Sequence, residues 1–324
     1  MTTWRAQAVL WLGVSAALGC GGKLDAGEDT PHGKLPVDER SAIVMVNDGP
    51  RDNWQGEYAI LLAAHRHVQF VGLIVNSSPV YPSLEDNVTG FREMIQAARD
   101  SGITHLPDPT ASVSPRLVRP ASGSIDDAVP NRSEGARLIL DAATRFGTTV
   151  HPLVVATGSA LTDVADAYLI DPTLAEHAVV VASLGTATAD GARAGGPNGD
   201  IDSWATTIVT SRMRYVQVNG YYDQLLDVPE ARAVELPDNP FGAWMAGKRG
   251  EILELTVACD QLSIQAAALP WFASGVTRMR VEPGDDPLLL TPDPAGEIWH
   301  VAGSDSDRAR DELWAALKDP STFR

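Results

Sequence analysis

The chain of 324 residues carries 25 Lys and Arg against 42 Asp and Glu, which gives a formal net charge of −17. Hydrophobic residues make up 44% of the chain and charged residues 21%, which is typical of globular proteins and not of collagens or disordered chains. A nucleic-acid binder needs an excess of Lys and Arg to neutralise phosphates, so the acidic balance argues against nucleic acid as a partner. It argues equally against docking on anionic lipid through a basic surface.

Residues 1–19 predict a signal peptide. Arg5 precedes an apolar run from Ala8 to Leu18, which is too short to span a bilayer as a helix. The run leads into ALGCGG, which resembles a bacterial lipobox, although Ala17 stands where Leu is usual. Cys20 is therefore the predicted lipidation site, with an ordinary secretory signal as the alternative. We expect a lipid-anchored protein of the bacterial cell envelope that faces the periplasm or the exterior and contacts the membrane through this anchor alone.

Residues 20–40 predict a flexible tether, because they are mostly polar residues, Gly and Pro. From residue 41 to residue 324 the pattern predicts one folded domain. If Cys20 is lipidated, Cys259 is the only cysteine that remains, so we expect no structural disulfide.

Short runs rich in Val and Ile alternate with helix-like stretches along the domain. Runs of this kind suit strands that are buried on both faces. The alternation predicts an α/β fold with an open, mainly parallel sheet and helices on both faces. The predicted strands cover residues 41–46, 68–75, 152–156, 178–183 and 215–218, and the main predicted helices cover 56–64, 84–101, 133–146 and 160–169. The glycine-rich stretch 185–200 is interpreted as a mobile loop and not as a strand.

The first predicted strand leads directly into the segment NDGPRDNWQGE. Ligands of open α/β sheets bind beyond the carboxyl ends of the strands, so Asp48, Asp52, Asn53 and Glu57 lie where a site is expected. Several oxygen donors on one loop suit Ca²⁺. The alternative is ordinary turn and helix-capping chemistry, which favours the same residue types.

Motifs along the chain resemble those of the inosine–uridine-type nucleoside hydrolases, and they occur in the order of that family. NDGPRDN and the strand VGLIV resemble its DxDPGxDD and VGITTVxGN segments. LVVATGSALTDVADAYLIDPTLAE resembles its strand, TGxLTN turn and helix. DIDSW is similar to EFNxW, and CDQL stands where the family has HDxL. The matches cover roughly residues 41–272 and imply a fold with a Rossmann-like core.

The resemblance implies Ca²⁺-assisted hydrolysis of the N-glycosidic bond of a ribonucleoside or related riboside. Asp48 matches a metal ligand that also activates the attacking water. Thr157 matches the residue that gives a main-chain carbonyl to the metal, and Asp260 matches a late Asp ligand. Asp52 and Asn53 match the final Asp pair of the first motif in an ungapped alignment. An alignment on the following helix inserts three residues and places Glu57 beside the second Asp position instead. Both registers remain open.

Substrate contacts are implied at Asp200 and Asp202, which match the Glu and Asn that bind the sugar hydroxyls. Trp204, with Tyr221, Tyr222 and Trp244, could stack on a base, with core packing as the alternative. His65, His67 and His300 are interpreted as structural. The implied partner is a small-molecule nucleoside or riboside, and homo-oligomers are common among proteins of this kind.

Two departures weaken the implied activity. Gly-Pro replaces Pro-Gly in the first motif and Asn53 replaces an Asp, which would alter metal affinity. Cys259 stands where many relatives have a His that protonates the leaving base, and a thiol of ordinary pKa replaces that His poorly. The alternative function is therefore a non-catalytic surface lipoprotein that keeps the fold and binds a nucleoside or sugar. A different glycoside or ribosyl conjugate as substrate is a third reading.

Overall fold

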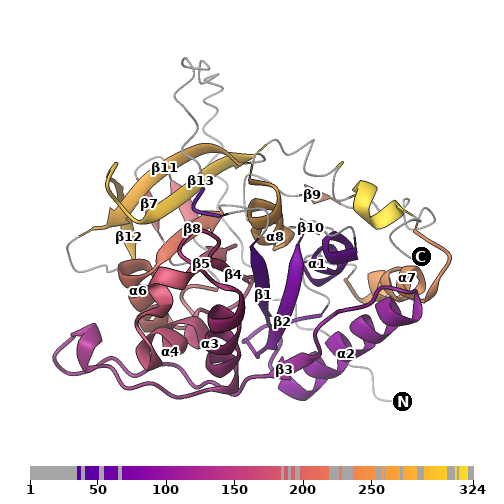
Figure 1. Cartoon of the computed structure of the whole chain (residues 1–324), viewed down its shortest axis with the longest axis horizontal. Helices are drawn as coiled ribbons and strands as arrows, with labels where there is room; N and C mark the ends of the chain where they lie inside the picture. The colour runs from indigo at the N-terminus through magenta and orange to yellow at the C-terminus, as the bar shows by residue number, and fades with distance from the viewer. Residues whose placement is uncertain are drawn as a thin grey trace, which may run out of the picture. The chain divides into compact units, whose positions relative to one another are not determined.

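Buried apolar runs form the centre of one large sheet. The computed structural model describes residues 35–37, 41–50, 55–64, 68–183, 186–188, 191–193, 198–218, 226–227, 236–252, 257–258, 260–270, 273–282, 288–304, 311 and 314–319. Within these residues the sheet has eleven strands in the order β3-β2-β1-β4-β5-β8-β13-β11-β12-β7-β6 (Figure 1). The strands from β3 to β13 in that order pair in parallel, and the rest pair antiparallel.

The parallel strands are β1 (Ala42–Asn47), β2 (Gln69–Val75), β3 (Pro109–Ala111), β4 (Leu153–Thr157), β5 (Ala178–Ala182), β8 (Arg214–Val218) and β13 (Ile298–Ser304). The antiparallel strands are β11 (Ala273–Val281), β12 (Leu289–Pro292), β7 (Gly191–Arg193) and β6 (Thr186–Thr188). A separate pair is formed by β9 (Leu226–Asp227) and β10 (Val257–Ala258). The predicted α/β fold with a mainly parallel sheet is confirmed.

Helices cover both faces of the sheet (Figure 1). The first face carries α1 (Gln55–Ala64), α2 (Leu84–Asp100), α7 (Pro240–Ile252) and α8 (Gln261–Ala268). The second face carries α3 (Glu134–Phe146), α4 (Thr162–Ile170) and α6 (Ser203–Arg212), and the short helices η1 (Ile125–Asp127) and α5 (Leu174–His177) lie in connections. Among the described residues, no helix combines the length and the apolar character that crossing a membrane requires.

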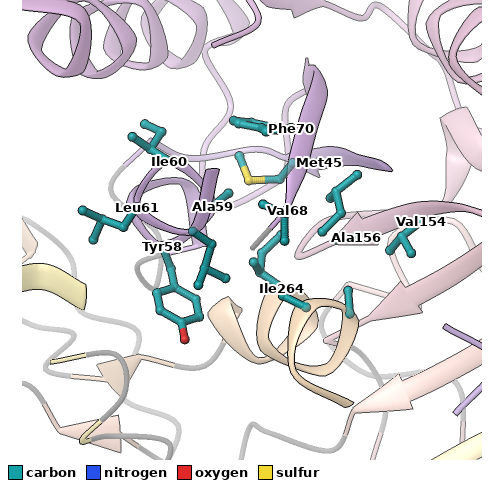
Figure 2. Close-up of a cluster of buried hydrophobic side chains, with 14 of the residues drawn as sticks. Met45, Tyr58, Ala59, Ile60, Leu61, Val68, Phe70, Val154, Ala156 and Ile264 are labelled. Atoms are coloured by element: carbon teal, nitrogen blue, oxygen red, sulfur yellow. The ribbon is translucent and has the colours of Figure 1, made fainter. Parts of the chain in front are cut away.

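Two hydrophobic clusters hold the layers together. Figure 2 shows part of the first, which combines Tyr58 of α1 and Ile264 of α8 with Met45 of β1 and Ala156 of β4. Successive residues of a strand point to opposite faces, so Val44 and Val46 belong to the second cluster. Every residue of β1 is buried, which explains why its sequence is a continuous apolar run rather than an alternating one.

The structure corrects the interpretation of residues 185–200 as a loop without strands. Within that stretch, β6 and β7 pair with each other, and Arg193 of β7 pairs with Leu289 of β12. The partner strand is distant in the sequence, so the local glycine-rich pattern carries no sign of it. Residues 35 and 37, which fall in the predicted tether, are Leu and Val, and both are buried in the first cluster. Packed structure therefore begins ahead of residue 41.

Candidate functional site

The site is built at the carboxyl ends of β1, β2 and β4, which are adjacent parallel strands. Val46 of β1 is in register with Thr157 of β4, and the amide of Gly158 donates to the carbonyl of Val46 at 3.1 Å. The amide of Asn76, just beyond β2, donates to the carbonyl of Asn47 at 3.2 Å. These bonds bring the segments that follow the three strands together at one edge of the sheet, the edge at which ligands bind in open α/β folds.

Asp48 is the first residue beyond β1, and only 3% of its surface is exposed. Burial raises the pKa of its carboxyl, and a hydrogen bond with the Ser78 side chain offsets part of that effect. Its Oδ1 atom has no hydrogen-bond partner in the part of the chain that the structure describes. A buried carboxylate oxygen in this state is costly unless a donor or a cation satisfies it.

Asp260 precedes α8 and is buried against the end of β4. A Cβ atom placed on Gly158 would lie 2.6 Å from both Cγ and Oδ2 of Asp260, so the carboxylate occupies the space that a side chain at 158 would need. Thr157, the neighbour of Gly158, is fully buried. Its carbonyl oxygen accepts the amide of Ser183 at 3.0 Å, and a carbonyl oxygen can accept a second hydrogen bond.

Glu57 lies in the first turn of α1 and is 3% exposed. Burial raises the pKa of its carboxyl to about 8. Near neutral pH this group is therefore mostly a neutral acid, unless a bound cation favours the ionised form.

The segment before α6 reaches the same edge of the sheet. The side-chain amide of Asn198 donates to the carbonyl of Gly158 at 2.7 Å, and Asp200 is exposed two residues later. Asp202 caps α6: its Oδ1 accepts from the amide of Ala205 at 3.0 Å. Its Oδ2 accepts from the Leu117 amide and from the Thr162 hydroxyl, each at 2.9 Å. Both oxygens of Asp202 are thus engaged inside the protein.

Trp204 lies in the second hydrophobic cluster and is 8% exposed, with the guanidinium of Arg119 5.3 Å from its ring centre. His300 is buried in β13 on the same sheet. Asp52, Asn53, Cys259 and Cys20 lie outside the described residues, as do His65, His67, Tyr221 and Tyr222. The structure therefore brings Asp48, Thr157 and Asp260 to one edge of the sheet. The choice between the register with Asp52 and Asn53 and the register with Glu57 stays open.

Sequence reasoning missed the polar residues that surround this site. Asn47 and Gln55 are hydrogen-bonded to each other at 2.6 Å, and Gln55 also donates to Ser263 at 2.7 Å. No local pattern signals the second bond, because its partners are 208 positions apart in the chain.

The donor chemistry suits a hard cation, since carboxylate and carbonyl oxygens are the ligands that Ca²⁺ prefers. The unsatisfied Oδ1 of Asp48 is the observation that fits such an ion best. No group of three or more His, Cys, Asp or Glu that could hold a metal occurs among the described residues, so part of a full ligand set would have to come from main-chain oxygens, water or residues 51–54.

Solved structures that are similar to this one include nucleoside hydrolases and an effector protein. A purine-preferring ribonucleoside hydrolase from Gardnerella vaginalis is 14% identical, with a TM-score of 0.60 over 87% of this chain and 100% of its own. An inosine–uridine-preferring nucleoside hydrolase from Bacillus anthracis is 16% identical, with a TM-score of 0.62 over 86% of this chain and 99% of its own.

A third similar structure is the type III effector protein XopQ complexed with adenosine diphosphate ribose. It is 12% identical, with a TM-score of 0.58 over 88% of this chain and 95% of its own. No protein-family model matches the sequence, and a search of curated proteins finds no significant match. The chain thus has the nucleoside hydrolase fold with a strongly diverged sequence.

Proposed function

We propose that this protein is a divergent member of the nucleoside hydrolase family that cleaves the N-glycosidic bond of a ribonucleoside or related riboside. One observation carries the proposal: Asp48 holds an unsatisfied, buried carboxylate oxygen at the edge of the sheet where Asp260 and the end of β4 also lie. Nucleoside hydrolases with the same fold support the substrate class, and the XopQ complex extends it to ribosyl conjugates.

Asp48, Asp260 and the main-chain carbonyl of Thr157 would hold Ca²⁺, together with Asp52 and Asn53 or Glu57. When bound, the ion would supply positive charge that keeps the buried carboxylates ionised and lowers the pKa of water beside them. Asp200 and Asp202 are the proposed contacts of the sugar hydroxyls, and Trp204 of the base. Both oxygens of Asp202 accept hydrogen bonds from the protein, so we propose that Asp202 contributes less to sugar binding than Asp200 does.

Asp48 is the proposed general base. Asp48 accepts a proton from water as the water oxygen bonds to the anomeric carbon of the ribose. The bond from that carbon to the nucleobase breaks, and its electron pair leaves on the nucleobase. The nucleobase then takes up a proton, so the products are ribose and the free nucleobase. Carboxylates near the sugar stabilise the positive charge that develops on its ring.

The decisive experiment measures release of the free nucleobase from a panel of purine and pyrimidine nucleosides and from adenosine diphosphate ribose, with Ca²⁺ present. Asp48→Asn should abolish release while the protein stays folded. Asp141→Asn, which changes an exposed carboxylate on α3, serves as the matched control and should keep wild-type turnover. Absence of turnover by the wild-type protein on every substrate would exclude the enzymatic function.

A second candidate function is non-catalytic binding of a nucleoside or sugar, which Cys259 and the rearranged first motif favour. Calorimetry separates the two functions, because saturable ligand binding without formation of ribose supports the binding protein alone. The test requires the same panel and the same Ca²⁺ concentration as the turnover assay.

We propose in addition that residues 1–19 are removed and that Cys20 carries a lipid which anchors the protein in the bacterial cell envelope. Expression in a bacterium with an alkyne-labelled fatty acid should label the wild-type protein and leave Cys20→Ser unlabelled. Analytical ultracentrifugation of the Cys20→Ser protein would test whether it forms a homo-oligomer.

A further inference from the structure

A continuous chain of hydrogen bonds runs through the protein interior. It connects the segment after β1, which carries Asp48, to the segment before α8, which carries Asp260. The side-chain amide of Asn47 donates to Oε1 of Gln55 at 2.6 Å. Nε2 of Gln55 donates to the hydroxyl of Ser263 at 2.7 Å, and that hydroxyl donates to the main-chain carbonyl of Asp260 at 2.7 Å. We name these four residues the amide bridge.

One end of the amide bridge closes the turn that carries Asp48. Oδ1 of Asn47 accepts the amide of Gly49 at 2.7 Å, so the side chain of Asn47 spans the residue between them. The other end is the residue Asp260 itself, whose carbonyl also accepts the amide of Ser263 at 3.1 Å. The bridge therefore joins the main chain around Asp48 to the main chain of Asp260, although β1 and α8 are far apart in the sequence.

The donors and acceptors of the bridge follow one direction. Because the Gly49 amide must face an oxygen, the amide of Asn47 is fixed with its nitrogen toward Gln55. Gln55 must then present its oxygen to Asn47 and its nitrogen to Ser263, so the Ser263 hydroxyl proton can only point to Asp260. Each hydrogen bond fixes the donor and acceptor roles in the next one. A side chain at position 55 that cannot accept from Asn47 and donate to Ser263 would interrupt the chain of hydrogen bonds.

Water has little access to the bridge. Asn47 is 1% exposed, and Gln55 and Ser263 are fully buried. Solvent therefore cannot replace a lost link without a rearrangement of α1 against α8, and a broken link leaves buried polar atoms unsatisfied. A buried network in which each side-chain nitrogen and oxygen atom has a partner, as here, fixes the geometry of the segments that it joins.

We propose that Gln55 is a positioning residue, which through Asn47 and Ser263 holds the Asp48 turn and Asp260 in register for one shared ligand. The inference rests on the proposed function for the identity of that ligand, whereas the mechanical coupling of the two segments does not depend on it. The side chain of Gln55 hydrogen-bonds to Asn47 and Ser263 and acts on both carboxylate residues through these neighbours.

The test compares Gln55→Met and Ser263→Ala with Gln265→Met. Gln265 is a suitable control because it is a buried glutamine of α8 whose amide donates to the hydroxyl of Tyr58 at 3.4 Å, outside the bridge. The first measurement is hydrogen exchange of the Gly49 amide in the absence of added ligand, and the second is the affinity for Ca²⁺ alone, by calorimetry. Thermal unfolding of all three variants reports the general loss of stability.

We expect Ser263→Ala to speed exchange at Gly49 by roughly tenfold and to weaken Ca²⁺ binding by a similar factor, with Gln55→Met at least as severe. Gln265→Met should leave both quantities within about twofold of the wild type, even where its unfolding temperature falls by as much as that of Ser263→Ala. If the Gly49 amide exchanges at the wild-type rate in Ser263→Ala, the positioning role of Gln55 is overturned. If the wild-type protein binds no Ca²⁺ and releases no ribose, the proposed function fails while the exchange measurement still decides the coupling.

Discussion

The carboxylate of Asp260 lies directly against Gly158, within 2.6 Å of the position that a Cβ atom on that glycine would take. Only a hydrogen fits at position 158 while the carboxylate keeps its place. The contact joins the end of β4 to the start of α8, and it explains the need for glycine here without any appeal to an unusual backbone angle.

Gly158→Ala should therefore displace Asp260 and impair ligand binding more than folding. We expect Ca²⁺ affinity and turnover to fall by roughly tenfold or more, with about 1–3 kcal/mol of destabilisation from the added methyl group. Calorimetry and thermal unfolding check the two parts. Gly247→Ala, at an exposed position of α7 where an added Cβ meets nothing within 4 Å, is the control and should retain full affinity. Equal binding by both alanine variants would mean that Asp260 is not a ligand.

Glu57 provides a prediction about pH. Burial raises the pKa of its carboxyl from 4.5 to about 8, so between these values the unfolded chain has released a proton that the native state keeps. This contribution to stability is fully present below pH 4.5 and is lost as the pH rises toward 8, by about 1.4 kcal/mol per pH unit as an upper bound. Glu57→Gln should accordingly gain stability relative to the wild type as the pH increases, which unfolding by denaturant at pH 5 and pH 8 measures.

An exposed glutamate of α2, Glu85, offers the matched control for that series. Glu85→Gln is a surface change and should alter the unfolding free energy by less than about 0.5 kcal/mol. A Glu57→Gln variant whose advantage does not grow with pH in metal-free buffer would contradict the burial of an ionisable group at this position.

The sequence predicted what depends on local pattern. The apolar run of β1 and the polar residues after it indicated both a central strand and the position of Asp48 beyond its end. The ordered motifs indicated that Thr157 ends a strand and that Asp260 precedes a helix. It failed where the deciding partner is distant. β7 was hidden in a glycine-rich stretch because its pairing with β12 is long-range, and Gln55 carried no signal because its partner Ser263 belongs to another helix.

Asp202 illustrates a third limit, since one residue type serves both sugar binding and helix capping. The motif DIDSW implied a contact with the substrate, whereas the structure gives both carboxylate oxygens of Asp202 partners in the protein. An Asp directly before a helix is also a preferred capping residue, and the sequence alone cannot separate the two uses.

The two aspartates before α6 should consequently respond differently to replacement by alanine. Asp202→Ala removes the cap of α6 and the acceptor of the Leu117 amide and the Thr162 hydroxyl, so we expect about 2–4 kcal/mol of destabilisation. Asp200 is exposed, and Asp200→Ala should change the unfolding free energy by less than about 0.5 kcal/mol. Ribose affinity, measured on both, should fall in Asp200→Ala; a loss confined to Asp202→Ala would place the sugar contact on Asp202 instead.

Asp163 of α4 ties both ends of the segment 112–133, which links β3 to α3. Its Oδ1 accepts from the hydroxyl of Ser112 at 2.6 Å and from the hydroxyl of Ser133 at 2.8 Å. Nearby Asp166 accepts the amides of Arg132 and Ser133 at 3.0 and 2.7 Å. Burial, followed by the charge of Asp166, raises the pKa of the Asp163 carboxyl, and the two serine hydroxyls lower it.

Asp163→Ala should loosen the segment at both ends, because each serine loses a buried acceptor. We expect about 3–5 kcal/mol of destabilisation and faster proteolysis within residues 112–133. Asp163→Asn keeps an oxygen that can accept from the two serine hydroxyls, so it should lose less stability than Asp163→Ala. The wild-type carboxyl has a raised native pKa, so its contribution falls as the pH rises above the unfolded value of 3.8, and the Asn variant should gain on the wild type from pH 4 to pH 7. Ser122→Ala, an exposed change within the same segment, should leave the rate of proteolysis unchanged. If the segment is cleaved at the same rate in all three variants, Asp163 does not hold its two ends.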